Sequence, residues 1–362
     1  GPNLSANKAL GAEPCNSLRR VRGVVTGTHR KQAQHPGFWK ANPILYANEK
    51  ENLYSYPKDR PFLLTQGRQV GGRSLTWGGI TLRLSDYDFH AANIDGYGPI
   101  WPIKYSDLSS HYSFLETFFN VHGNKDSLEQ LPDGNYLDPL PFTESEKYFS
   151  NKLREVLGYK VIHSRGFGVY DRGDNCDWPK YSSPGSTLEK AFKTGLVELI
   201  SDHLVEHIIM NKSQDRATGV LAINKKNGDR EVFKSDLIVL CSSTIQSLRI
   251  LLSSEENNID KGFIDSSKSL GCNLMDHIST CRFFNLASIK SDIHSEDVND
   301  SKSLSGAGSF FIPLGNKRDN YGKVDFIRGY GIWGGIDRFN LPKYLQKEPE
   351  SKIGFLIGHG EV

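Results

Sequence analysis

The sequence predicts a fold of mixed class, in which an α/β part is combined with an α+β part that contains an antiparallel sheet. Two observations lead to this expectation. The apolar run Leu237–Cys241 leads through a hydroxyl-rich turn into an amphipathic segment, which is the order strand, turn and helix. Short β-branched runs joined by polar turns between 207 and 233 indicate antiparallel hairpins. A length of 362 residues leaves room for two or three domains.

Apolar residues at helical spacing predict the helices, and runs rich in aromatic and β-branched residues predict further strands. We expect helices over 107–121, 144–157 and 186–198, and sheet strands within 306–314 and 326–335. Residues 1–60 carry several prolines and little periodicity, so the sequence predicts a long loop there.

Composition excludes several classes of function. Lys and Arg number 44 against 42 Asp and Glu, and the basic residues are scattered, which argues against nucleic-acid binding. The longest apolar stretch is far shorter than the roughly 20 residues of a membrane-spanning helix. Five irregularly spaced cysteines suggest buried thiols, with no disulfide framework or zinc site. The compartment stays open between the cytoplasm and the periplasm or exterior.

The densest glycine cluster is GRQVGGRSLTWGG, residues 67–79, with five glycines in thirteen residues. Glycine lets the backbone approach a flat ring or a phosphate closely, because it has no Cβ and reaches positive φ. The helix after Leu237–Cys241 would direct free N–H groups at an anion or dipole. The alternative is that Ser242 or Ser243 merely caps this helix.

Four motifs occur in order along the chain: the glycine cluster, Ala217–Val220, Ser243–Ser254 and Leu270–His277. Together they resemble signature elements of the glucose-methanol-choline oxidoreductases, in the branch of bacterial sugar dehydrogenases and pyranose-oxidase-like enzymes. The resemblance implies a Rossmann-like FAD-binding domain and a substrate domain with an antiparallel sheet. The first domain would comprise 1–100 and 200–280, and the second 101–199 and 281–362.

The resemblance also implies which residues contact FAD. These are Arg68, Val70, Gly71, Gly72, Ser74, Leu75, Thr76, Trp77, Gly78, Gly79, Val205, Ser242, Ser243, Asp276 and His277. Relatives that bind flavin covalently carry a histidine at the position of Thr76, so the resemblance implies non-covalent FAD here. No metal site is expected.

The family opens with a Gly-x-Gly-x-x-Gly turn that starts a helix in an N-terminal βαβ unit, and no such motif opening a helix is expected in this sequence. Its catalytic histidine pair is expected in a C-terminal segment that this sequence also lacks. We therefore expect a chain truncated at both ends, whose own catalytic residues cannot be named. A structural role is the more plausible one for His277.

The expected function is part of an FAD-dependent enzyme that oxidises a CH–OH group of a sugar or another alcohol by hydride transfer to flavin N5. Oxygen, a quinone or another protein could accept the electrons, and a second chain or segment could complete the active site. The alternative is a non-catalytic subunit or scaffold derived from the same fold. Sequence leaves the substrate and the oligomeric state open.

Overall fold

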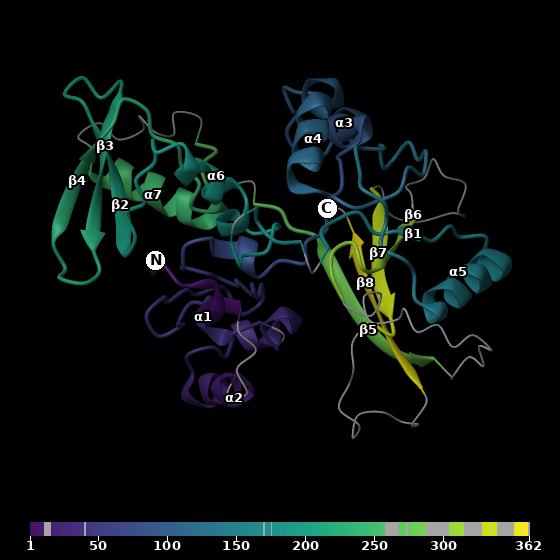
Figure 1. Cartoon of the computed structure of the whole chain (residues 1–362). Coiled ribbons are helices and arrows are strands. Elements are labelled where there is room, and N and C mark those ends of the chain that lie inside the picture. Colours follow the sequence, from purple (N-terminus) through teal and green to yellow (C-terminus); the bar gives the residue numbers. More distant parts are fainter. Residues whose placement is uncertain are drawn as a thin grey trace. The chain divides into compact units, whose positions relative to one another are not determined.

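The chain divides into two compact units, seen in a computed structural model (Figure 1). The first unit comprises 1–76 and 191–274, and the second comprises 77–190 and 275–362. The structure describes residues 1–10, 16–39, 41–168, 171–174, 176–257, 268–272, 274–286, 304–314, 328–338 and 351–360.

The N-terminal sixty residues contain several short helices, so the predicted long loop is wrong. They are α1 (Ala6–Leu10), α2 (Asn16–Thr26) and the 3₁₀ turns Gln32–Gln34, Pro36–Trp39 and Pro43–Leu45. Proline starts two of these turns, because its fixed φ suits the first helical position. Fully buried Phe38 packs against the rings of His29 and Tyr46 and anchors this part of the unit.

A three-stranded antiparallel sheet follows in the first unit, as predicted. Its order is β2 (His203–Met210), β3 (Ala217–Asn224) and β4 (Arg230–Lys234). Helix α7 (Thr244–Asn257) packs on β2. Buried Ser254 joins them, since its Oγ accepts from the Ile208 N–H at 2.8 Å and donates to the Ile250 carbonyl at 2.6 Å.

Leu237–Cys241 forms no strand and is not buried, which corrects that prediction. The segment belongs to no sheet in the described residues. Leu237 is 76% exposed and Val239 is 71% exposed. Its apolar, β-branched composition favours a strand, but a strand needs partners to pair its backbone and cover its side chains.

The second unit is built on a five-stranded antiparallel sheet. Its order is β1 (Ile162–His163), β6 (Phe310–Leu314), β7 (Tyr330–Ile336), β8 (Lys352–Gly360) and β5 (Ile278–Leu286). Phe310, Ile312 and Ile336 form the buried core with Val161, and Phe149 of α5 (Glu144–Leu157) packs against them. The strands predicted within 306–314 and 326–335 are confirmed as β6 and β7.

The three predicted helices are present, and the structure adds α3 (Asp86–Asp95), which was not predicted. The predicted helices are α4 (Tyr105–Phe119), α5 and α6 (Thr187–Lys193). α5 has the predicted bounds, and α4 is shifted by two residues. α6 is shorter than the predicted 186–198 because Gly195, in the left-handed conformation at φ 70°, follows it.

Candidate functional site

The glycine cluster forms a tight turn up to Thr76 in the first unit. Gly71 and Gly72 have φ of 91° and 50°, and a 3₁₀ turn over Gly72–Leu75 follows. The Ser74 hydroxyl donates to the Gly71 carbonyl at 2.6 Å, so it stabilises the loop itself. The Leu75 side chain is buried, so only its backbone could contact a ligand.

The next three residues belong to the second unit and present an open surface. Trp77 is 39% exposed. Its ring packs edge to face on the Phe167 ring, with the two centroids 5.5 Å apart. No protein atom lies within 4 Å of the position that a Cβ on Gly78 would occupy. The same holds for Gly72 in the first unit. These glycines therefore leave room that nothing in the described chain fills.

The Gly79 backbone is in close contact with Gly166, Phe167 and Gly306. Its carbonyl accepts from the Phe167 N–H at 3.0 Å. A Cβ on Gly166 or on Gly306 would lie well inside contact distance of that same oxygen. Only glycine fits at both positions, which fixes the backbone path just after Trp77.

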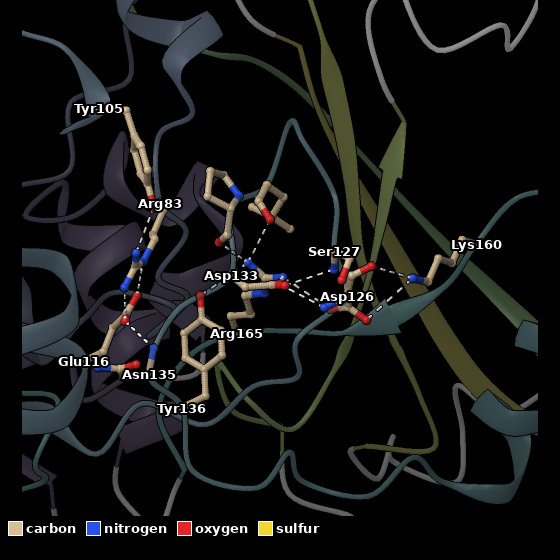
Figure 2. Close-up of polar contacts among 12 residues, drawn as sticks. Arg83, Tyr105, Glu116, Asp126, Ser127, Asp133, Asn135, Tyr136, Lys160 and Arg165 are labelled. Atoms are coloured by element: carbon tan, nitrogen blue, oxygen red, sulfur yellow. Dashed lines mark hydrogen bonds and ion pairs between the residues drawn. The ribbon is translucent and has the colours of Figure 1, made fainter. Parts of the chain in front are cut away.

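Buried ion pairs stiffen the segments behind this surface (Figure 2). Arg165 accepts from the Thr81 N–H through its backbone carbonyl at 2.9 Å. Its fully buried guanidinium donates to Pro132 O at 2.7 Å and to Asp133 Oδ1 at 2.9 Å, and Asp126 lies at 3.4 Å. Burial raises the pKa of Asp126.

Arg83 makes a second buried pair, with Glu116 of α4. Two guanidinium N–H groups bind the two carboxylate oxygens at 2.7 and 2.6 Å, and a third donates to Tyr105 at 2.9 Å (Figure 2). The hydrogen bonds that Arg83 donates to Glu116 raise the pKa of Arg83. Burial raises the pKa of neighbouring Tyr136 to about 12. These groups stay in one ionisation state near neutral pH, so their role is structural.

The other expected FAD residues of the first unit lie around β2 and α7. The Val205 carbonyl accepts from Arg249 of α7 at 3.4 Å, and the β2–β3 register shifts just after it. Burial, then the charge of Arg249, lowers the pKa of Arg68. Ser242 is exposed, and Ser243 has a φ of 70° before α7. A serine held in this conformation is strained, and such strain is concentrated at functional sites.

The Val70 N–H donates to the Pro2 carbonyl at 3.0 Å, which joins the glycine cluster to the start of the chain. In the second unit, Asp276 and His277 are exposed at the start of β5. Asp276 accepts from the His277 N–H, and the His277 ring lies 6.0 Å from that of His359, centroid to centroid. Asn273 of the same motif lies outside the described residues.

Two histidines that show no partner in sequence have one in space. His122 lies 3.2 Å from an Asp171 oxygen, and His203 lies 3.3 Å from a Glu231 oxygen. Sequence could not show the first pair, because 49 residues separate its members. Cys241 and Cys272 are exposed, which corrects the expectation of buried thiols.

Neither a metal-ligand cluster nor a membrane-spanning helix occurs among the residues that the structure describes. No group of three or more His, Cys, Asp or Glu side chains among them could hold a metal ion. In the same part of the chain, no helix has the length and apolar character needed to cross a membrane.

One family model matches part of the chain. Residues 152–279 match the family described as GMC oxidoreductase. Three of the four motifs, Ala217–Val220, Ser243–Ser254 and Leu270–His277, lie inside the matched residues. The glycine cluster lies outside them, so its assignment to the GMC family rests on the resemblance alone.

Two curated relatives and one solved structure are similar to this chain. The large subunit of fructose dehydrogenase from Gluconobacter japonicus is 21% identical over 76% of this chain and 59% of its own length. A 2-methyl-1,2-propanediol dehydrogenase from Mycolicibacterium austroafricanum is 23% identical over 75% of this chain and 50% of its own. The chain thus spans between half and three fifths of these relatives.

The solved structure is a formate oxidase of Aspergillus oryzae RIB40, studied for modification of its FAD. It matches with a TM-score of 0.51 and 12% identity, over 84% of this chain and 61% of that one. At this identity the likeness concerns the fold alone. It supports the mixed architecture of helices and antiparallel sheet.

Proposed function

We propose that this chain is part of an FAD-dependent oxidoreductase that oxidises a CH–OH group of a sugar or another alcohol. The observation that carries the proposal is the open backbone surface at Gly78 beside the exposed ring of Trp77. The match to the GMC oxidoreductase family and the two relatives, one named for a sugar and one for a diol, support the substrate class. FAD is the cofactor that the resemblance to GMC oxidoreductases implies, and the formate oxidase of similar fold is a protein with FAD.

Each unit, taken by itself, offers groups that a flavin dinucleotide could contact. Gly72 and Gly78 have free space where a side chain would otherwise stand, and Trp77 offers a flat apolar face. Ser242 and strained Ser243 precede the free N–H groups of α7, which suit an anionic or polar edge. Bound there, FAD would supply the acceptor for a hydride, at flavin N5.

Binding is non-covalent in this proposal, because Thr76 has neither a ring nitrogen nor a thiol to bond to the flavin. The remaining expected contacts are Arg68, Val70, Gly71, Ser74, Leu75, Gly79, Val205, Asp276 and His277. Of these, Ser74 already donates its hydroxyl hydrogen within the loop. It could therefore offer FAD only an acceptor lone pair.

A further segment or second chain is proposed to complete the first unit. Leu237–Cys241 is apolar, has no regular secondary structure and has no ladder partner in the described residues. The stretch 196–200 has the same character, and its Leu196 is 89% exposed. Two unpaired apolar segments flank the three-stranded sheet in sequence. Added strands would pair their backbones and cover their side chains.

The substitution Gly78→Ala tests the flavin site. FAD should bind the unmodified chain reversibly, quenching flavin fluorescence as the dinucleotide stacks near Trp77. In Gly78→Ala the added methyl meets no protein atom, so the urea midpoint of the FAD-free chain stays unchanged. It occupies space proposed for flavin, so the dissociation constant for FAD rises roughly tenfold or more.

Gly358→Ala is the matched control, since its methyl would meet only Thr280 at 3.5 Å. Equal FAD affinity in the unmodified chain and Gly78→Ala would place the flavin elsewhere. Absence of FAD binding by the unmodified chain would favour the alternative, a scaffold derived from the same fold.

Dye reduction tests the reaction. The FAD-loaded chain, supplied with the further segments that pair with Leu237–Cys241 and carry the expected catalytic histidines, should reduce an artificial electron acceptor when sugars or polyols are added. The chain alone should not, because it lacks those histidines in this proposal. Oxygen, quinones and acceptor proteins, compared in the same assay, identify the electron acceptor. Flavin binding without turnover of any alcohol would contradict the proposed reaction.

A further inference from the structure

Both ring nitrogens of His122 face acceptors. Nδ1 lies 2.8 Å from the Asp138 carbonyl oxygen, and Nε2 lies 3.2 Å from Asp171 Oδ2. A neutral imidazole donates from one nitrogen only, whereas the imidazolium donates from both. The observed arrangement therefore satisfies both acceptors only when His122 is charged. The ring is 15% exposed, so water offers little substitute.

The acceptors of His122 belong to segments that hold the turn around Phe167. The His122 backbone donates to Gly166 O at 2.8 Å and accepts from Gly166 N at 2.9 Å. Asp171 Oδ2, which faces the His122 ring, also accepts from the Gly168 N–H at 3.2 Å. Phe167 thus lies between Gly166, which hydrogen-bonds to the His122 backbone, and Gly168, which hydrogen-bonds to Asp171.

Phe167 is the residue that touches the proposed flavin wall. Phe167 is 3% exposed. Its ring packs edge to face on the rings of Trp77 and Phe119, with centroids 5.5 and 5.8 Å apart. Its N–H donates to the Gly79 carbonyl. A shift of Gly166–Gly168 would therefore move Trp77, through the ring of Phe167, and Gly79, through the Phe167 N–H.

The charges around the pair favour the imidazolium near neutral pH. The hydrogen bond with Asp171 has the largest effect on the pKa of His122 and raises it. Burial lowers this pKa, the hydrogen bond with the Asp138 carbonyl raises it, and the net pKa lies above 6.5. The hydrogen bond with His122 lowers the pKa of Asp171, and the charge of Lys180 acts in the same direction. The contribution of His122 is complete below pH 6.5 and is lost as pH rises through its folded-state pKa.

We propose that His122 and Asp171 form a positioning pair that holds Phe167 against Trp77 and thereby sets the Trp77 ring at the flavin site. The flavin part of this inference rests on the proposed function. Neither residue touches substrate or cofactor, and their effect reaches Phe167 through the hydrogen bonds to Gly166 and Gly168. Loss of the imidazolium leaves one acceptor without its donor and loosens the hold on Gly168 and Phe167.

Trp77 fluorescence of the FAD-free chain, titrated from about pH 5 to about pH 9, tests the positioning pair. The Trp77 signal is the difference between each protein and its Trp77→Phe counterpart. The unmodified chain should show a transition with a midpoint above 6.5. His122→Gln should abolish it. Asp171→Asn, which keeps an acceptor but loses the charge, should lower the midpoint by about one pH unit or more.

His111→Gln is the control, because His111 is exposed on α4 and should leave the transition intact. A transition that persists in His122→Gln overturns the proposal. Asp171→Asn serves as the second variant if His122→Gln fails to fold, and an unshifted midpoint there also overturns it.

FAD titration separates this inference from the proposed function. The dissociation constant should rise about fivefold across the transition in the unmodified chain and stay constant in His122→Gln. FAD binding without any Trp77 transition overturns the positioning pair and leaves the flavin site standing. A Trp77 transition without FAD binding supports the pair and overturns the flavin site.

Discussion

Replacing Arg338 by methionine is expected to lower the free energy of unfolding by about 3 to 5 kcal/mol. Arg338 and Glu146 are almost completely buried, at 1% and 0% side-chain exposure. Two guanidinium N–H groups bind the two Glu146 oxygens at 2.9 and 2.6 Å. Without Arg338, Glu146 would keep only the backbone N–H groups of Thr143 and Ile336, and its buried charge would have no counter-ion.

Urea denaturation followed by near-ultraviolet circular dichroism measures this loss. The double variant Glu146→Leu/Arg338→Met should recover much of the stability, because removing both charges leaves neither one buried alone. Lys152→Met is the matched control: Lys152 forms an exposed pair with Glu155 and its loss should not shift the transition. A midpoint for Arg338→Met equal to that of Lys152→Met would show that the buried pair does not hold α5 on the sheet.

Glu146 caps the start of α5 and also pairs with a distant arginine, and the sequence could predict only the first of these roles. The start of α5 was predictable because its capping residues are adjacent: Thr143 accepts from the Glu146 N–H, and Glu146 accepts from the Thr143 N–H. Gly158 ends the helix with a φ of 72°. The tertiary partner of Glu146 was not predictable, since Arg338 lies 192 residues away in a sequence with many arginines.

In the candidate site too, features set by local sequence were predictable, and features set by distant segments were not. Glycines gathered within thirteen residues predicted a turn with backbone exposed to a ligand, and the φ of Gly71 and the open space at Gly78 agree with it. Leu237–Cys241 has strand composition, but burial depends on partners that local sequence cannot name. Gly166 and Gly306, which support Gly79, carry no local signal either, because the need for glycine arises only where distant segments meet.

Gly306→Ala is expected to disturb both stability and the proposed flavin site. The new Cβ would overlap the Gly79 carbonyl oxygen and lie within 3.0 Å of the Ile80 nitrogen, and both of these are backbone atoms. A rotamer change cannot relieve such a clash, so the backbone of one segment must move. We expect a loss of about 3 kcal/mol in the free energy of unfolding. Gly358→Ala, whose methyl has ordinary contact distance, should lose far less.

The two effects of Gly306→Ala can be separated by comparison with Gly78→Ala. Gly306 lies behind Gly79, so its methyl would push the Trp77–Gly79 segment out of place and weaken FAD binding indirectly. Stability and FAD affinity should therefore fall together in Gly306→Ala, whereas only FAD affinity falls in Gly78→Ala. A Gly306→Ala chain that is destabilised yet binds FAD with unchanged affinity would show that the position of Gly79 is immaterial to the flavin. The proposed site would then be reduced to the part of the glycine cluster before Trp77.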